Sequence, residues 1–498
     1  ALVAGMLGAA DIPVVWTAGA NPRVAGDGAL AFTSDPGFSR GAVALGADAS
    51  LTLPSETVLD VGSLTVNGVA KPTGLYSAAN VPQIKAGRIF VRGDDLVLTE
   101  PVTFLQVEAG KTNSIDELIA TAPTAGTVLK TGGGVVTSSD RLRGFTGQIV
   151  IAEGGFSVDG NGQTGPQDAA TAPGIRVLSG ASFILAEGAA QNQLKLYNSF
   201  RLVGTGLDGR GAIDNELTTS QYYAFIYAPS VTLEGDARIG GAGTAQVGFR
   251  SAFDLNGHVL EFHRADAGSW QTPFLLSYLS VSGAGSIVVN GARLQLDRIQ
   301  FGAAVSSVDL VNRAELQYEM RSGVSGANTA LRFAPGGGTK LTLVYAYTAQ
   351  GTPQTWSGPV AGAGTVSGGA LVVDGPWKPD PSGVLAAAGN LAFGAESTLT
   401  ADDPASPLFA GSHVIAQADG TLGDLPALDP ELVASGWRLM RSTDDPNRLV
   451  LFGNPGSPEL FAGTPLPVPN AGFESITGTM PTGWTAGDGS WHAEEGTG

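Results

Sequence analysis

Residues 126–158 decide the fold of this chain, because they repeat one short strand pattern. They read Gly-Thr-Val-Leu-Lys-Thr-Gly-Gly-Gly-Val-Val from residue 126 and Gly-Phe-Thr-Gly-Gln-Ile-Val-Ile-Ala-Glu-Gly-Gly-Phe-Ser-Val from residue 144. Each part consists of two short strands of alternating apolar residues on either side of a glycine turn. A chain that winds such strands over themselves many times forms a β-solenoid, whose function lies on its outer surface.

The composition agrees with a chain of many short strands. Among 498 residues there are 72 glycines, about twice ordinary usage, and only 14% charged residues. Short runs of Thr, Val, Ile, Leu and Ala alternate with Gly, Asn, Asp and Pro. Similar phrases, such as those at Ser230–Leu233 and Ser286–Val289, return at roughly 20- to 30-residue spacing, which is the range of solenoid repeats. We therefore expect a nearly all-β protein with little helix.

The quoted stretch also resembles a known repeat family. Leu129-Lys-Thr-Gly-Gly-Gly134, followed by Phe145-Thr-Gly147, is similar to the autotransporter-associated β-strand repeat. That pattern is leucine, lysine, threonine, glycine, any residue and glycine, then an aromatic residue, threonine, glycine and a strand closing on glycine. Residues 64–76 and 84–91 are similar to phrases in other large secreted proteins of this kind. The resemblance covers a minor part of the chain and implies a bacterial, passenger-like secreted or cell-surface protein.

Two architectures suit such strands: an array of β-sandwich hairpins, or a parallel β-helix. Residues 341–347 place Leu341, Leu343, Tyr345 and Tyr347 on one face of a strand, and Thr342, Val344 and Ala346 on the other. One apolar face and one small, mixed face favour a right-handed parallel β-helix. Sandwich domains would also show linkers, and none is visible. We expect Leu341, Leu343 and Tyr345 to be buried, and Thr342 and Val344 to face outward.

Two short helical insertions are predicted on the β-helix. Ser114-Ile-Asp-Glu117 is a capping box that opens a helix running to about Ala120. Asp429-Pro-Glu-Leu-Val-Ala-Ser-Gly436 has an N-cap residue, proline at the first helical position and a closing glycine.

The chain divides into four predicted segments. We interpret residues 1–10 as the remnant of a signal peptide, the alternative being a buried first strand. Residues 11–453 are the predicted β-helix, and residues 454–469 are a proline-rich linker. Residues 470–498, with Phe473-Glu-Ser and Gly483-Trp484, resemble the truncated start of a jelly-roll, carbohydrate-binding-type module.

Charge and cysteine content exclude several classes of function. The net charge of −18, from 45 acidic and 27 basic residues, disfavours nucleic acid and anionic membrane surfaces as partners. The absence of cysteine excludes thiol catalysis, thiolate metal sites and disulfides. No stretch has the length of a membrane-spanning helix, and no cofactor is indicated.

Catalytic motifs are incomplete. Hydrolases with a β-helix fold use adjacent aspartates together with Gly-His-Gly and Arg-Ile-Lys phrases. The partial matches are Asp402-Asp403 and Asp444-Asp445, each before a proline, Asn256-Gly-His258 without the following glycine, and Arg88-Ile89 before Phe90. We therefore predict no catalytic residue.

Two further motifs are also incomplete or short. Residues 159–170 begin like a calcium loop but lack its sixth-position glycine and twelfth-position glutamate, so no metal site is predicted. Arg92-Gly93-Asp94 spells an integrin-type tripeptide, which we interpret as a chance match at a turn.

One aromatic cluster is a candidate binding site. In Gln221-Tyr-Tyr-Ala-Phe-Ile-Tyr227, strand alternation places Tyr223, Phe225 and Tyr227 on the same face. Pointing inward, they would form a core ladder, which is the interpretation that we favour. Pointing outward, they would form a platform on which sugars stack.

The sequence therefore predicts a secreted or cell-surface β-helix stalk with a structural or adhesive role and no active site. Its expected partner is an extracellular polysaccharide or a cell surface. Two alternatives stay open: a polysaccharide-active enzyme, either a hydrolase or a lyase, and a glycan-binding module. A row of exposed aromatic side chains would favour binding, whereas an acidic groove with converging carboxylates would favour a hydrolase.

Overall fold

The computed structural model describes most of the chain. The described residues are 14–15, 23–26, 29–31, 41–53, 58–71, 74–78, 80–91, 98–99, 101–188, 193–218, 223–264, 274–277, 280–297, 299–318, 329–334, 338–343, 352–380, 382–402, 411–453, 484–487 and 490–493.

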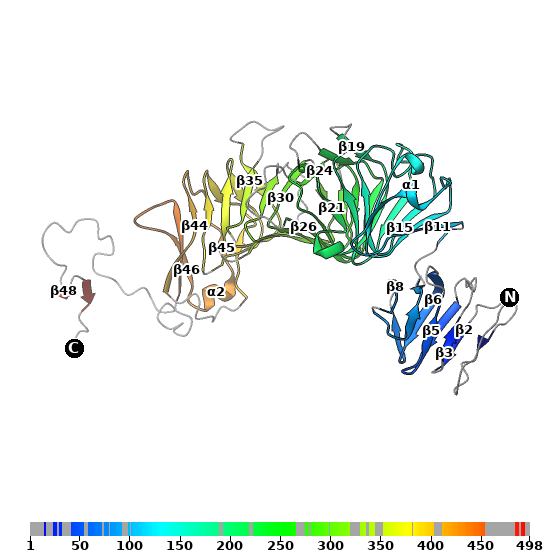
Figure 1. Ribbon diagram of the computed structural model, residues 1–498. Coiled ribbons are helices and arrows are strands. Elements are labelled where there is room, and N and C mark those ends of the chain that lie inside the picture. The colour runs from blue at the N-terminus through cyan, green and yellow to red at the C-terminus, as the bar shows by residue number, and fades with distance from the viewer. Residues whose placement is uncertain are drawn as a thin grey trace.

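The protein is a parallel β-helix, as the sequence predicted (Figure 1). From residue 101 to residue 453 the chain winds into stacked coils, and each coil contributes short strands to long parallel ladders. We call the three main ladders face 1, face 2 and face 3; faces 1 and 2 join at one long strand, β23. Coil length varies from 17 residues between Val360 and Trp377 to 31 residues between Phe200 and Val231.

The strands of the faces follow the chain in order. Face 1 consists of β11 (Val102–Gln106), β13 (Thr127–Thr131), β15 (Gln148–Ile151), β17 (Gly174–Val177), β20 (Phe200–Gly204), β23 (Ser230–Gly240), β25 (Ala252–Asp254), β28 (Ser280–Ser282) and β31 (Gln300–Phe301). Face 2 consists of β12 (Thr112–Ser114), β14 (Val135–Thr137), β16 (Gly154–Val158), β18 (Ala181–Leu185), β21 (Ile213–Asn215), β23, β26 (His258–His263), β29 (Gly285–Asn290), β32 (Val305–Val311), β34 (Ala330–Phe333), β37 (Val360–Gly362), β40 (Trp377–Lys378), β43 (Thr398–Leu399) and β45 (Ala427–Leu428).

Face 3 starts later along the chain. It consists of β19 (Gln193–Leu196), β22 (Tyr223–Ile226), β24 (Gln246–Phe249), β27 (Phe274–Ser277), β30 (Arg293–Asp297), β33 (Glu315–Tyr318), β35 (Lys340–Leu343), β38 (Gly364–Ser367), β41 (Leu385–Ala387), β44 (Gly411–Ala418), β47 (Arg448–Gly453) and β46 (Arg438–Arg441). A short fourth ladder consists of β36 (Gln354–Trp356), β39 (Leu371–Val373) and β42 (Leu391–Phe393).

The core is a column of apolar side chains that stack from coil to coil. In face 3, Leu294, Leu316, Leu341 and Val366 pair in register and are almost completely buried. Leu341 and Leu343 are buried and Thr342 is half-buried on the outer side, which confirms the predicted alternation. Val344 and Tyr345 lie outside the described residues.

The Leu-Lys-Thr-Gly motif forms one tight turn of the helix wall. Gly132 has φ +78°, and a Cβ there would lie 2.2 Å from the carbonyl oxygen of Val107 on the preceding coil. The Lys130 side chain is fully buried, and its ammonium donates hydrogen bonds to the carbonyl oxygens of Thr131, Gly132 and Glu153 at 3.1, 2.6 and 2.8 Å. The motif is therefore explained by backbone packing between adjacent coils.

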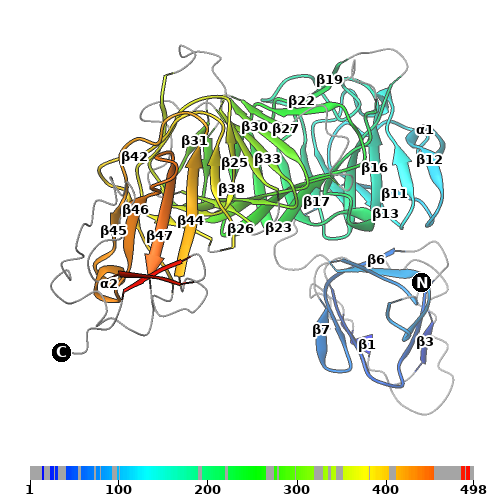
Figure 2. The same cartoon turned by 90° about the vertical axis from the view of Figure 1, so that its left-hand side faces the viewer.

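A smaller stack precedes the main one. Its larger sheet contains β1 (Val14–Val15), β2 (Arg23–Gly26), β4 (Gly41–Leu45), β6 (Val58–Val66), β7 (Val69–Lys71), β8 (Gly74–Tyr76) and β10 (Arg88–Val91), and its smaller sheet contains β3 (Ala29–Ala31), β5 (Ser50–Thr52) and β9 (Ile84–Ala86). Figure 2 shows these strands arranged around a common interior. Buried apolar side chains between Val43 and Val91 form a core there that is separate from the main one.

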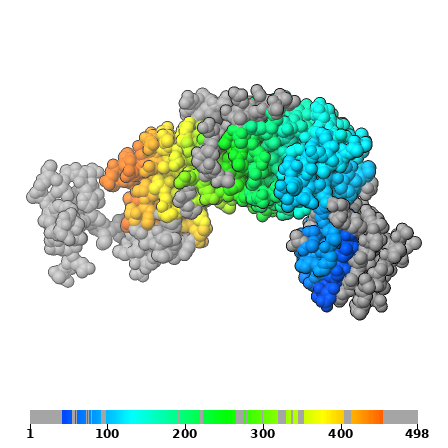
Figure 3. All heavy atoms as spheres, viewed as in Figure 1, coloured from blue at the N-terminus to red at the C-terminus, as the bar shows by residue number. Residues whose placement is uncertain are grey.

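Within the described residues, the two stacks share no strand ladder. No strand of the first stack pairs with β11 or with later strands among the described residues. They touch instead through Phe90, which packs with Leu129, Val150 and Leu178 on the outer side of face 1. Figure 3 shows the described atoms of the two stacks next to each other. The predicted β-helix over residues 11–453 did not anticipate this break.

Both predicted helices are present. The first, α1 (Ile115–Leu118), opens with the Ser114–Glu117 capping box. The second, α2 (Pro430–Ala434), has Asp429 as its N-cap and is followed by Gly436 at φ +87°. Two 3₁₀ turns, η1 (Asp140–Leu142) and η2 (Leu207–Gly209), lie in loops. None of the helices in the described part of the chain combines the length and apolar character needed to cross a membrane.

The last coils are closed by an antiparallel hairpin. Strand β47 pairs antiparallel with both β44 and β46, and Trp437 is buried beneath it. Beyond the solenoid, β48 (Trp484–Gly487) and β49 (Ser490–Ala493) form an antiparallel pair.

Candidate functional site

The predicted aromatic residues lie on the outer side of face 3. In β22, Ala224 and Ile226 point into the core and are fully buried, whereas Tyr223 and Phe225 are half-buried on the opposite side. Tyr227, directly after the strand, is also half-buried. The favoured interpretation of these rings as a core ladder was therefore wrong. Both sides of this strand are apolar, so alternation alone does not determine which side faces inward.

The aromatic rings contact one another over two adjacent coils. The ring centroids of Tyr223 and Phe225 are 5.4 Å apart in an edge-to-face arrangement, and those of Phe225 and Tyr227 are 6.0 Å apart. On the preceding coil, Tyr197 stacks on Tyr227 with 5.4 Å between centroids and 17° between ring planes. We call Tyr197, Tyr223, Phe225 and Tyr227 the aromatic platform.

The next coil supports the platform with a glycine and an arginine. Phe225 pairs in register with Gly248, where a Cβ would lie 2.5 Å from the Phe225 ring. The missing side chain therefore makes room for the ring to lie across the neighbouring strand. The guanidinium carbon of Arg250 is 5.3 Å from the Phe225 centroid and 5.5 Å from the Tyr227 centroid, within the range of a cation–π contact.

Polar side chains border the rings. Lys195 is the register partner of Phe225 on the preceding coil, and Gln193 and Gln246 are those of Tyr223. The outer side of three coils thus combines aromatic faces with amide, ammonium and guanidinium donors. Electron-rich ring faces attract the C–H groups of a sugar ring, and such donors pair with sugar hydroxyls. Such an arrangement suits contact with a sugar chain.

Sequence reasoning missed Tyr197 and Arg250 because they belong to neighbouring coils. A signal for Tyr197 was present, since Leu194-Lys195-Leu196-Tyr197 repeats the alternation of Ala224-Phe225-Ile226-Tyr227 one coil earlier. Arg250 carries no comparable signal, because its role depends on the register between β22 and β24.

The partial catalytic matches lie on different coils. His258 begins β26 and lies 3.8 Å from Asp236, whereas Asp402 follows β43 and pairs with Lys378. Asp445 lies in the closing hairpin, 3.4 Å from Arg448. Arg92-Gly93-Asp94 and Asp403 lie outside the described residues.

A metal centre is not formed by the described residues either, since no group of three or more His, Cys, Asp or Glu side chains comes together there. In the loop at residues 159–163, the Asp159 carboxylate accepts a hydrogen bond of 2.7 Å from Gln163.

Comparisons of this chain with models of protein families, with curated proteins and with solved structures found no match.

Proposed function

We propose that this chain is a non-catalytic β-helix scaffold, secreted or displayed at a cell surface, that binds glycans on its aromatic platform. The observation that carries the proposal is the outward orientation of Tyr223 and Phe225, with Tyr197 and Tyr227 stacked beside them. The half-buried rings lose their remaining contact with water when a ligand covers them. A solenoid wall holds them in place, so little conformational entropy is lost on binding.

Further support comes from the sequence. The resemblance of residues 129–147 to the autotransporter-associated repeat is in keeping with a bacterial surface or secreted protein. The net charge of −18 disfavours strongly anionic polymers as general partners. Neutral polysaccharides, whose sugar rings offer C–H faces to Tyr and Phe, are therefore the proposed ligands.

Two binding assays test the proposal: affinity electrophoresis with soluble polysaccharides and pull-down with insoluble ones. The purified chain is run through gels containing soluble xylan or mixed-linkage glucan, and is mixed with insoluble cellulose or chitin. We expect retention by at least one neutral polysaccharide. Because loss of one stacking ring costs about 1 kcal/mol, Phe225→Ala and Tyr227→Ala should each weaken retention by about fivefold to tenfold.

Phe104→Ala is the matched control, since Phe104 is 39% exposed on face 1, away from the platform. It should leave retention unchanged. If none of the four polysaccharides retains the chain, or if the Phe104 variant loses as much retention as the platform variants, the proposed function is wrong.

A further inference from the structure

A groove on face 2 runs along the axis of the solenoid, over coils that come after the aromatic platform. It has a volume of about 540 Å³, and its lining residues come from β29, β32, β34, β37 and β40, which are consecutive strands of that face. With coils about 4.8 Å apart, five strands span on the order of 19 Å. The groove is therefore long and narrow.

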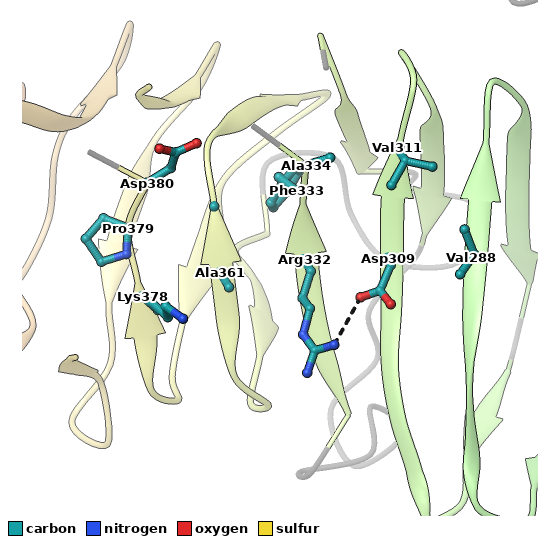
Figure 4. Close-up of a pocket in the computed structure, with 11 residues that line it drawn as sticks. Val288, Asp309, Val311, Arg332, Phe333, Ala334, Ala361, Lys378, Pro379 and Asp380 are labelled. Atoms are coloured by element: carbon teal, nitrogen blue, oxygen red, sulfur yellow. Dashed lines mark ion pairs between the residues drawn. The ribbon is translucent and has the colours of Figure 1, made fainter. Parts of the chain in front are cut away.

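The floor of the groove is made by small and apolar residues. Arg332, Ala361 and Lys378 pair in register on successive strands, so the small Ala361 leaves a hollow between two long side chains. Gly362, at φ +89°, pairs with Phe333, where a Cβ would lie 1.9 Å from the Phe333 carbonyl oxygen. The remaining floor comes from valine, alanine and proline (Figure 4).

Charges of both signs line the same groove. Arg332 points toward Asp309, with 3.6 Å between Nη1 and Oδ1 (Figure 4). Lys378 forms an ion pair with Asp402, which lies outside the lining of the groove. Asp380 lines the groove beyond Lys378. The lining itself thus carries two cations and two acids along an apolar floor, and Asp402 adds a third acid beside Lys378, so the groove does not favour an anionic ligand.

Two carboxylate oxygens in this groove lack a hydrogen-bond donor. Asp309 Oδ2 accepts from Ser307, and Asp380 Oδ1 accepts from Ser382, but Asp309 Oδ1 and Asp380 Oδ2 are buried and accept no hydrogen bond from the described residues. Burial also raises the pKa of Asp309. A ligand in the groove would therefore meet the Arg332 and Lys378 cations and the carboxylates of Asp309 and Asp380 as its polar partners.

We propose that the groove binds an uncharged linear oligosaccharide that lies parallel to the solenoid axis. One coil spacing, about 4.8 Å, is close to the length of one sugar unit in an extended chain, so successive units meet successive strands. Sugar C–H faces cover the apolar floor at Ala361 and Gly362, and hydroxyls pair with Asp309, Arg332 and Lys378. This site is separate from the aromatic platform and does not rest on the function proposed for it.

Titration calorimetry with three hexasaccharides tests the proposal: cellohexaose and xylohexaose, which are neutral, and hexagalacturonate, which is anionic. We expect at least one neutral hexasaccharide to bind, and to bind more tightly than hexagalacturonate. Ala361→Phe fills the hollow in the groove and should weaken that binding by about tenfold or more.

Ala386→Phe is the matched control, because Ala386 is half-buried at the centre of β41 on face 3, outside the groove. It should bind like the unmodified chain, and circular dichroism should show that both variants fold. Phe225→Ala separates the two sites, since it should leave groove binding unchanged. The proposal is overturned if neither neutral hexasaccharide binds, if hexagalacturonate binds more tightly, or if Ala361→Phe binds as well as Ala386→Phe. Loss of binding in Phe225→Ala but not in Ala361→Phe would assign the saccharide to the platform and also reject the groove.

Discussion

Replacing Thr342 with valine should destabilise the solenoid although Thr342 lies on its outer side. The Thr342 hydroxyl donates a 2.6 Å hydrogen bond to Glu315 on the preceding coil, and Glu315 is only 3% exposed. Arg293, one coil further back, contacts the other carboxylate oxygen at 2.9 Å. Valine keeps the shape of threonine but removes the donor. Hydrogen bonds to charged groups contribute about 1.5–3 kcal/mol to stability, so we expect Thr342→Val to lower the free energy of unfolding by that amount at pH 7.

The loss should depend on pH in one direction. Burial raises the pKa of Glu315, but hydrogen bonds from Thr342 and Gln317 and the charges of Arg293 and Lys340 more than offset it, so its pKa lies below the ordinary 4.5. A carboxylate with a lowered pKa stabilises the fold above its unfolded-state pKa, and this contribution is lost as the pH falls through its folded-state pKa. The difference between Thr342→Val and the unmodified chain should therefore be largest near neutrality and should shrink in acid.

Urea unfolding followed by circular dichroism at several pH values measures this difference. Thr365→Val is the control, because Thr365 is exposed on the next coil and changes there usually fall within about 0.5 kcal/mol. Equal midpoints for the two variants at pH 7 would refute the reasoning. The reasoning would also be refuted if the loss of unfolding free energy in Thr342→Val grew as the pH was lowered.

Three further outcomes follow from burial, charge and capping. Leu341→Ala, at a fully buried position, should cost about 2–5 kcal/mol in urea unfolding, whereas Gln295→Ala on the outer side should cost little. Burial raises the pKa of Asp214 from 3.8 to about 6 despite its contact with Arg210. The protonated Asp214 side chain is therefore compatible with the fold below about pH 4, and this stability is lost as the pH rises through 6. The free energy of unfolding, compared with that of Asp214→Asn, should fall by about 3 kcal/mol over that interval, and a pH-independent difference would contradict this. Ser114→Ala should cost about 1 kcal/mol by removing the cap of α1, and unchanged thermal unfolding would show that the cap contributes nothing.

Alternation and turn chemistry were sufficient to predict the fold, because these signals are local. Leu341 and Thr342 were assigned to the correct sides, since an apolar row beside a polar one has only one favourable orientation. The caps of α1 and α2 were readable for the same reason, because N-cap residues act within a few positions of themselves. The orientation of Phe225 was not readable, since Ala224 and Ile226 on the opposite side are also apolar.

The two candidate sites are assembled along the solenoid axis, and this explains why sequence reasoning found one only in part and missed the other. Residues that touch across coils are separated in sequence by a full coil, and coil length varies from 17 to 31 residues. Arg332, Ala361 and Lys378 align only because the strands around them pair in a particular register, which no local pattern specifies. Inward residues must fit a stack of neighbours, whereas outward residues such as Ala361 affect packing little. The chemistry of the outer wall can therefore change by substitution at a few outward positions while the same core supports the fold.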